Sequence, residues 1–196
     1  MSPQTIDRQP ALSSSSWIKT YYYIRFGVSA AWVAAALTVA KNAPPIAAIL
    51  LIAYPAWDAI ANYLDARRSG GLARNRSQML NLVVSIVTTA AVAVALGRGM
   101  GAVLVVFGIW AVLAGAFQLV TAVRRWKSYG AQWAMILSGA QSALAGGFMV
   151  KIAGGSDPLG IADIAPYAAF GAFYFLVSAV WLTVGDARRG RTAVSA

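Results

Sequence analysis

The sequence predicts an all-α integral membrane protein, a bundle of six transmembrane helices arranged as three consecutive helical hairpins. Of its 196 residues, 59% are hydrophobic and only 11% are charged. A soluble domain carries about 25% charged residues, so this chain could not cover a water-facing surface. Six stretches each reach the roughly 20 apolar residues that a helix needs to cross a bilayer. Lys and Arg gather after every second stretch, as expected for a chain that crosses the membrane six times.

The six apolar stretches are expected at about residues 22–40, 45–64, 78–96, 102–123, 131–152 and 166–185. Pro45 and Pro166 lie in the first turn of the second and sixth stretches, where a helix does not need the N–H that proline lacks. Asp163, just before the sixth, has the charge that suits a helix N-terminus. Ser69-Gly70-Gly71 is typical of a helix C-cap. Residues 16–189 would form the transmembrane domain, and 1–15 and 190–196 flexible cytoplasmic tails.

The distribution of positive charge predicts that both termini are cytoplasmic. Twelve of the 16 Lys and Arg residues fall in segments that would then lie inside the cell. Only Lys41, Arg98 and Lys151 would lie outside, and Arg25 lies within the first stretch. Because positive residues accumulate on the cytoplasmic side of membrane proteins, this bias sets the expected orientation.

The net charge of +10 suggests contact with lipid and not with nucleic acid. The basic residues are spread over four short segments at helix ends, without interleaved aromatic residues on which bases could stack. We therefore expect anionic lipid headgroups at the cytoplasmic face to be the partner of this charge, and no nucleic acid.

The amino-acid composition argues against an enzyme, a metal site and a cofactor. All six acidic residues are Asp, and the chain has no Glu, His or Cys. Thiol and imidazole catalysis, disulfides and the common zinc and haem ligand sets are therefore excluded. No third carboxylate lies in a span beside Asp58 and Asp65 to complete a metal cage.

The second stretch carries the most polar face of the six. Tyr54, Asp58, Asn62 and Asp65 recur at helical spacing, so they share one face. Pro55 removes the N–H that would bond the carbonyl of Leu51, which predicts a helix kink just above Asp58. Since charged residues inside a bilayer are costly, this intramembrane polar cluster is the candidate functional site.

Arg25 is expected to complete this cluster. It lies about one turn inside the cytoplasmic boundary of the first stretch, and Asp58 about two turns inside the same boundary of the next. We predict an Arg25–Asp58 ion pair that is hydrogen-bonded by Asn62. Two interpretations are open: a static pair that holds the first hairpin together, or a proton- or ion-sensing pair that loosens when Asp58 is protonated.

Other polar and small residues are interpreted as packing contacts. Gln118 in the fourth stretch and Gln141 in the fifth could form hydrogen bonds across helices, or could line a narrow pore. Gly139, Ala143 and Gly147 have the spacing of four that suits close helix packing. A mild polar face on the third stretch contains Asn81, Ser85, Thr88 and Thr89.

The chain also contains signs of an internal repeat. Asp-Ala-Arg-Arg occurs at residues 65–68 and again at 186–189, in both cases at the end of an inward-running stretch, and Arg124-Arg125 ends the fourth stretch in a similar way. The spacing between these Arg pairs is close to the length of one helical hairpin, so a unit of two spans that occurs three times would explain the pattern. The alternative is that any inward-running helix tends to end in Arg.

Residues 108–124 resemble the signature repeat of the HdeD family of acid-resistance membrane proteins. In that family a helix reads roughly Gly-x-Phe-Gln-x-x-x-Ala-x-Arg near its cytoplasmic end, and Gly115, Phe117, Gln118, Ala122 and Arg124 match. The length and the six-span layout are similar too, whereas the second stretch, with Tyr54-Pro55-Ala56-Trp57-Asp58, departs from the pattern. The resemblance implies a multi-pass protein of the bacterial inner membrane linked to acid or envelope stress. It brings no catalytic residues and no agreed mechanism.

We therefore expect a non-enzymatic membrane protein with a role in acid or envelope stress. One alternative is a small channel or transporter whose polar path lies near Arg25, Asp58 and Asn62. Another is a structural subunit of a larger membrane assembly. Six short helices enclose little volume, so a channel would form more easily between copies, which leaves a homo-oligomer open.

Overall fold

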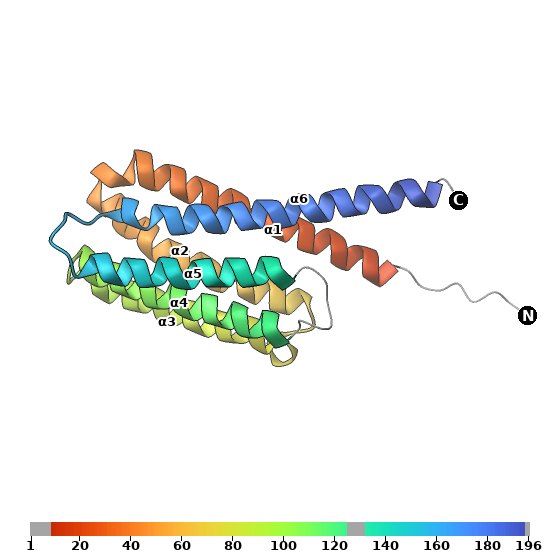
Figure 1. Cartoon of the computed structure of the whole chain (residues 1–196), viewed down its shortest axis with the longest axis horizontal. Coiled ribbons are helices and arrows are strands. Elements are labelled where there is room, and N and C mark those ends of the chain that lie inside the picture. Colours follow the sequence, from red (N-terminus) through yellow and green to blue (C-terminus); the bar gives the residue numbers. More distant parts are fainter. Residues whose placement is uncertain (1–8, 125–131, 195–196) are drawn as a thin grey trace, which may run out of the picture. The chain divides into compact units, whose positions relative to one another are not determined.

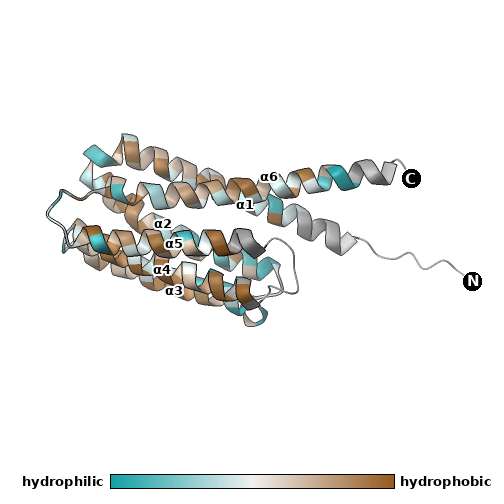
Figure 2. Cartoon of the chain, viewed as in Figure 1, coloured by the Kyte–Doolittle hydropathy of each residue, from teal (hydrophilic) through white to brown (hydrophobic). Residues whose placement is uncertain are grey.

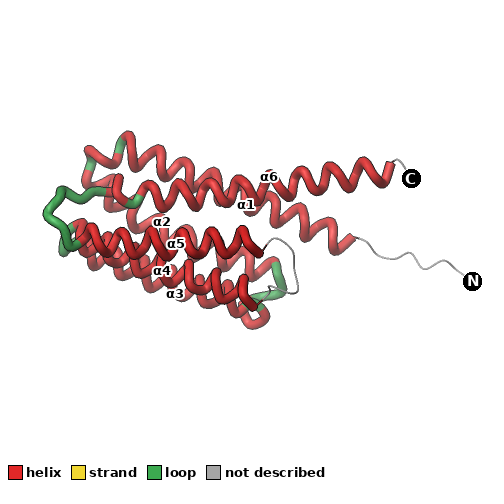
Figure 3. The backbone as a smooth tube through the Cα atoms, viewed as in Figure 1, coloured by secondary structure: helices red, strands yellow, loops and turns green. Residues whose placement is uncertain are grey.

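The computed structural model describes the backbone of residues 9–124 and 132–194, and this part of the chain is helical, with short turns and no strand (Figure 3). Residues 1–8, 125–131 and 195–196, which include parts of both expected tails and Arg125, lie outside the described residues. The α-helices in chain order are α1 (Gln9–Thr38), α2 (Pro44–Arg68), α3 (Arg76–Leu96), α4 (Met100–Arg124), α5 (Gln132–Ala153) and α6 (Ala165–Val194) (Figure 1). Three short 3-10 helices lie in the connections: η1 (Ala40–Asn42), η2 (Leu72–Arg74) and η3 (Ile161–Asp163).

Each of the six α-helices is long and apolar enough to cross a membrane, which confirms the predicted fold class. The most apolar segments are Met100–Val120 and Arg76–Leu96, with mean hydropathies of 2.4 and 2.2. Figure 2 shows hydrophobic residues along the middle of α3 and α4 and hydrophilic residues gathered at helix ends. Large apolar side chains such as Leu144 and Ile49 are 75% and 65% exposed, as expected for residues that face lipid. The orientation of the termini stays a prediction.

The chain divides into two compact units, which we describe separately. The first unit comprises Met1–Ala31 and Ala169–Ala196, and the second comprises Trp32–Ala168. The boundary therefore falls inside α1 and inside α6. Both helices also extend beyond the predicted spans, because α1 begins at Gln9 and α6 ends at Val194.

In the second unit, consecutive helices α2, α3, α4 and α5 pack against one another, most extensively α4 against α5 (Figure 1). The core contains the buried side chains of Leu51, Leu104, Phe107 and Met149. Trp32, at the start of this unit, donates an indole hydrogen bond of 2.8 Å to the Leu50 carbonyl and so ties the end of α1 to α2. The closest helix pair thus joins the second predicted hairpin to the third.

Four glycines allow the backbones of α4 and α5 to approach closely. A Cβ atom at Gly108 would lie 2.6 Å from the Gly146 carbonyl oxygen, and one at Gly139 would lie 2.9 Å from the Gly115 carbonyl oxygen. The glycines are seven residues apart on each helix, so both contacts lie on one face. Gly147 has nothing within 4 Å of its Cβ position, so the expected spacing of four was wrong there: the facing glycine is Gly146.

The turn after α2 confirms the predicted C-cap. Gly70 and Gly71 have φ values of +95° and +90°, a region in which residues with a Cβ are strained. The Gly71 N–H donates 2.8 Å to the carbonyl of Ala66, as in a Schellman motif. This turn directs the chain into α3.

Two other sequence signals, Pro55 and Asp163, were expected to kink α2 and to begin the sixth helix. Pro55 is buried within α2, which is one helix from Pro44 to Arg68, and the kink stays a prediction. Asp163 belongs to η3, where its carboxylate accepts a 2.7 Å bond from the Gly160 N–H. Asp163 therefore caps the 3-10 helix before α6.

In the first unit, α1 and α6 run antiparallel and are joined by polar and aromatic contacts. Lys19 Nζ on α1 lies 3.1 Å from Asp186 Oδ2 on α6. The other oxygen of this carboxylate lies 2.7 Å from Arg189 Nη2 on the same helix. The Tyr23 and Thr183 hydroxyls lie 3.1 Å apart. These side-chain contacts connect the two helices directly.

Candidate functional site

Asp58 is the centre of a hydrogen-bonded cluster that joins α2 to α3. Its Oδ2 atom accepts a 2.7 Å bond from the Ser85 hydroxyl on α3 and a 2.9 Å bond from the Asn62 amide one turn along α2. The same Asn62 nitrogen also donates 2.8 Å to the Asp58 carbonyl. Because the acceptor is a carboxylate, such bonds are about twice as strong as those between neutral groups.

Trp110 extends the cluster to α4. Its indole N–H donates 3.3 Å to the Ser85 hydroxyl oxygen, so the hydroxyl accepts from one helix and donates to another. The bonds thus run in one direction, from Trp110 through Ser85 to Asp58. Chains of this kind polarise one another, which strengthens each bond. We call Asp58, Asn62, Ser85 and Trp110 the Asp58 network.

An aromatic cluster packs around the Trp110 end of the network. Tyr54 contacts Trp110 edge-on at 5.9 Å between ring centroids, and Phe107 and Tyr167 do so at 5.8 and 6.0 Å. Trp32 contacts Tyr54 in a tilted arrangement, with 4.8 Å between ring centroids. Edge-to-face pairs add about 0.5–1.5 kcal/mol each beyond their burial, so the indole is firmly oriented toward Ser85.

The network is poorly accessible. Ser85 is 1% exposed, Trp110 5% and Asn62 8%, whereas Asp58 is part-buried. Few water molecules can therefore compete for these donors and acceptors, and each lost bond would leave a polar atom without a partner. In this arrangement the Asp58 carboxyl bonds α3 directly and is connected to α4 through Ser85.

The predicted polar face of α2 is only partly one site. Tyr54, Asp58 and Asn62 all belong to the network or its aromatic wall. Asp65 lies two turns further along, where its Oδ2 accepts a 3.1 Å bond from Gln78 at the start of α3. The helix α2 therefore has two separate carboxylate contacts with α3, and only that of Asp58 involves a third helix.

Arg25 belongs to the first unit, so its predicted ion pair with Asp58 stays a prediction. Within that unit its guanidinium carbon lies 4.4 Å from the centroid of the Phe175 ring, and Nη1 donates 3.0 Å to the Tyr21 hydroxyl. A cation over an aromatic face is attracted by the negative face of the ring. Arg25 thus contributes to the pairing of α1 with α6.

Gln118 and Gln141, which were predicted to bond across helices, are part-buried on α4 and α5. Their role stays a prediction. The structure shows a different polar contact between these helices, a 3.0 Å bond from the Ser142 hydroxyl to the Ala111 carbonyl. It lies between the two glycine contacts of the same crossing.

Sequence reasoning missed the roles of Ser85 and Trp110. Ser85 lies on the polar face expected for α3, but that face was interpreted as packing. Trp110 lies in the stretch that resembles the HdeD repeat, two residues after Gly108, and had no assigned role. A polar face on one helix that faces an isolated intramembrane Asp on the next is the signal that could have found Ser85.

The network does not provide a ligand set for a metal ion. No group of three or more His, Cys, Asp or Glu side chains that could hold a metal occurs within residues 9–124 and 132–194.

Helices, lipid-facing side chains and a polar network in the bundle together define the class of a multi-pass membrane protein. Within this class, residues 83–151 match a family model described as "Short repeat of unknown function (DUF308)". This match covers about a third of the chain and includes Ser85, Trp110 and all four glycines of the α4–α5 crossing. No curated protein and no solved structure matches the chain.

Proposed function

We propose that the chain is a non-enzymatic protein of the bacterial inner membrane that acts in acid or envelope stress, with Asp58 as the acid-responsive group. The observation that carries this proposal is the Asp58 network, in which one carboxylate oxygen accepts bonds from two side chains and connects α2, α3 and, through Ser85, α4. The resemblance of residues 108–124 to the HdeD repeat supports the stress role. These residues lie inside the matched repeat, whose description gives no function.

The physical basis is the difference between the two forms of Asp58. The charged form is a strong acceptor for both Ser85 and Asn62. A protonated carboxyl carries one donor of its own and bonds its partners more weakly. Acid would therefore weaken the connection between α2 and α3, and a looser packing of these helices is the expected response.

Few other groups could produce such a response in this unit. α3 and α4 carry no charged residue between Arg76 and Arg98 or between Arg98 and Arg124. The other titratable side chains near the network are the phenols of Tyr54 and Tyr167, which contact Trp110, and Asp65, which is bonded to Gln78. Arg25 would be a further partner if the predicted ion pair forms.

Acid survival of cells that carry the chain tests the proposal. We expect Asp58→Asn to lose the survival benefit at normal protein abundance. Asp65→Asn is the matched control, because it changes the other carboxylate of α2 outside the network. Normal survival of the Asp58→Asn cells at normal abundance would contradict the proposal.

A flux measurement separates this role from transport. Proteoliposomes with the purified chain should show no movement of protons or small solutes above the background of empty liposomes. Flux that is abolished by Asp58→Ala would favour the channel or transporter alternative instead.

A further inference from the structure

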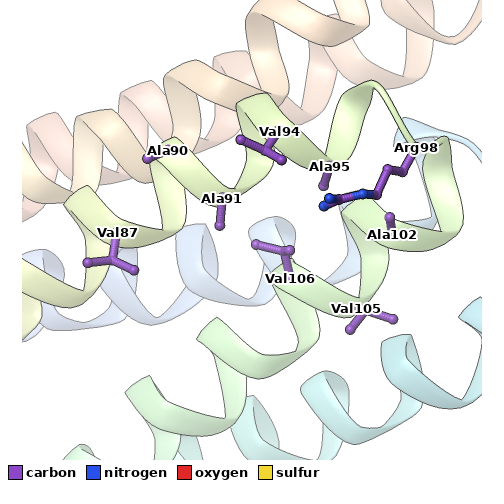
Figure 4. A pocket seen from close by; sticks show the side chains of 9 residues that line it. All are labelled: Val87, Ala90, Ala91, Val94, Ala95, Arg98, Ala102, Val105 and Val106. Atoms are coloured by element: carbon purple, nitrogen blue, oxygen red, sulfur yellow. The ribbon is translucent and has the colours of Figure 1, made fainter.

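An apolar groove runs along the outer surface of the second unit between α3 and α4. All but one of its lining residues are alanine or valine, from Val87 to Ala95 on α3 and from Ala102 to Val106 on α4. The exception is Arg98, in the turn between the two helices. Figure 4 shows its side chain extending back over the groove, with the guanidinium beside Ala95 and Ala102.

The groove approaches the length of a lipid tail in one leaflet. The eight-residue step from Val87 to Ala95 on α3 corresponds to about 12 Å along the helix axis. Half of a typical hydrocarbon core is about 15 Å. The alanine side chains that line it are small, and Val87 and Val94 are 61% and 58% exposed. A flexible alkyl chain fits such a shallow depression lined by alanine and valine.

Arg98 adds a charge at the end of the groove. Within the described part of the chain its guanidinium makes no hydrogen bond or ion pair. A guanidinium is suited to bind phosphate oxygens through two parallel bonds. Arg98 lies in the turn between α3 and α4, at the end of the apolar groove. The headgroup layer of the bilayer is expected at the level of this turn.

We propose that this groove is a binding site for one anionic glycerophospholipid, with an acyl chain between α3 and α4 and the phosphate on Arg98. A lipid is favoured over a partner helix because one molecule supplies both the alkyl chain and the anion at the observed separation. The site is independent of the Asp58 network, since none of its lining residues belongs to that network.

Native mass spectrometry of the detergent-purified full chain tests this site, with phosphatidylglycerol as the probe and phosphatidylcholine as the zwitterionic comparison. We expect one tightly held phosphatidylglycerol and about tenfold weaker retention in Arg98→Gln, the size expected for a lost charged hydrogen bond. Lys151→Gln is the matched charge control, because Lys151 is exposed at the end of α5 outside the groove.

A second pair of variants tests the groove itself. Ala91→Phe should fill it and release the lipid, whereas Ala93→Phe, at an exposed position of α3 outside the lining, should retain it. Equal losses in Arg98→Gln and Lys151→Gln would overturn the proposal, as would unchanged binding in Ala91→Phe. Displacement of the lipid by an equal concentration of glycerol phosphate would also overturn it, because the tail would then contribute nothing.

Discussion

Ser85 on α3 donates a 2.7 Å hydrogen bond to the carboxylate of Asp58 on α2, and its oxygen accepts the indole N–H of Trp110 on α4. A hydroxyl is the smallest side chain that can both donate and accept in this way. At 1% exposure, Ser85 has no room for a larger substitute. This one side chain therefore links three membrane helices.

Replacing Ser85 by Ala should destabilise the folded state by about 1–3 kcal/mol, because Asp58 and Trp110 each lose a buried partner. Unfolding of the purified protein by a denaturing detergent measures the change. Ser77→Ala, at an exposed position of the same helix, is the control. Equal stability of the two variants would show that the bond contributes nothing.

Trp110→Phe should cost about 1 kcal/mol through loss of the indole N–H donor, while an aromatic ring remains in the cluster. In the double variant with Ser85→Ala, we expect less than the sum of the two single effects, because both changes remove the same bond. The four unfolding free energies of this cycle give the coupling directly. Additive effects would mean that the 3.3 Å contact is not a stabilising bond.

Gly115→Ala should destabilise the α4–α5 pair by about 1–3 kcal/mol, since an added Cβ atom would meet the backbone of Gly139 and Ala143. Gly147→Ala on α5 is the matched control, because nothing lies within 4 Å of its Cβ position. Thermal unfolding of the two variants should therefore differ clearly. A stable Gly115→Ala protein would contradict the close helix crossing.

Phe175→Leu should weaken the pairing of α1 with α6 by about 0.5–2 kcal/mol, because the Arg25 guanidinium loses its aromatic contact with α6 and keeps only that with Tyr21 on its own helix. Phe173→Leu, at a position 56% exposed, removes an aromatic ring without this contact. Cysteine cross-linking between α1 and α6 measures the pairing, and the chain has no native Cys to interfere. Equal cross-linking in the two variants would exclude a contribution from the cation–π contact.

The six helices could be predicted because a bilayer imposes both length and composition on each of them. The third stretch, expected at residues 78–96, is α3 from Arg76 to Leu96. The far ends of α1 and α6 could not be predicted in this way. Their helices continue into polar sequence, and hydropathy marks the end of the apolar run and not the end of the helix.

The candidate site was predictable on one helix but not across helices. Periodicity places Tyr54, Asp58 and Asn62 on one face of α2. In the structure Asn62 bonds Asp58, and Tyr54 contacts Trp110 of the same network. The periodicity of α2 does not show which face of α3 packs against these residues, so Ser85 was interpreted as a packing residue. Trp110 was missed for a related reason, since an indole has one polar atom and resembles any core aromatic residue in a sequence.

The distance between α2 and α3 as a function of pH tests the central claim most directly. Spin labels at Y63C and M79C, both exposed positions, report this distance in the full chain in lipid bilayers. From neutral to acidic pH, we predict a broader and longer distance distribution in the otherwise native protein. Asp58→Asn should show the broad distribution at both pH values. An unchanged distribution in the native background would contradict an acid-responsive Asp58 network.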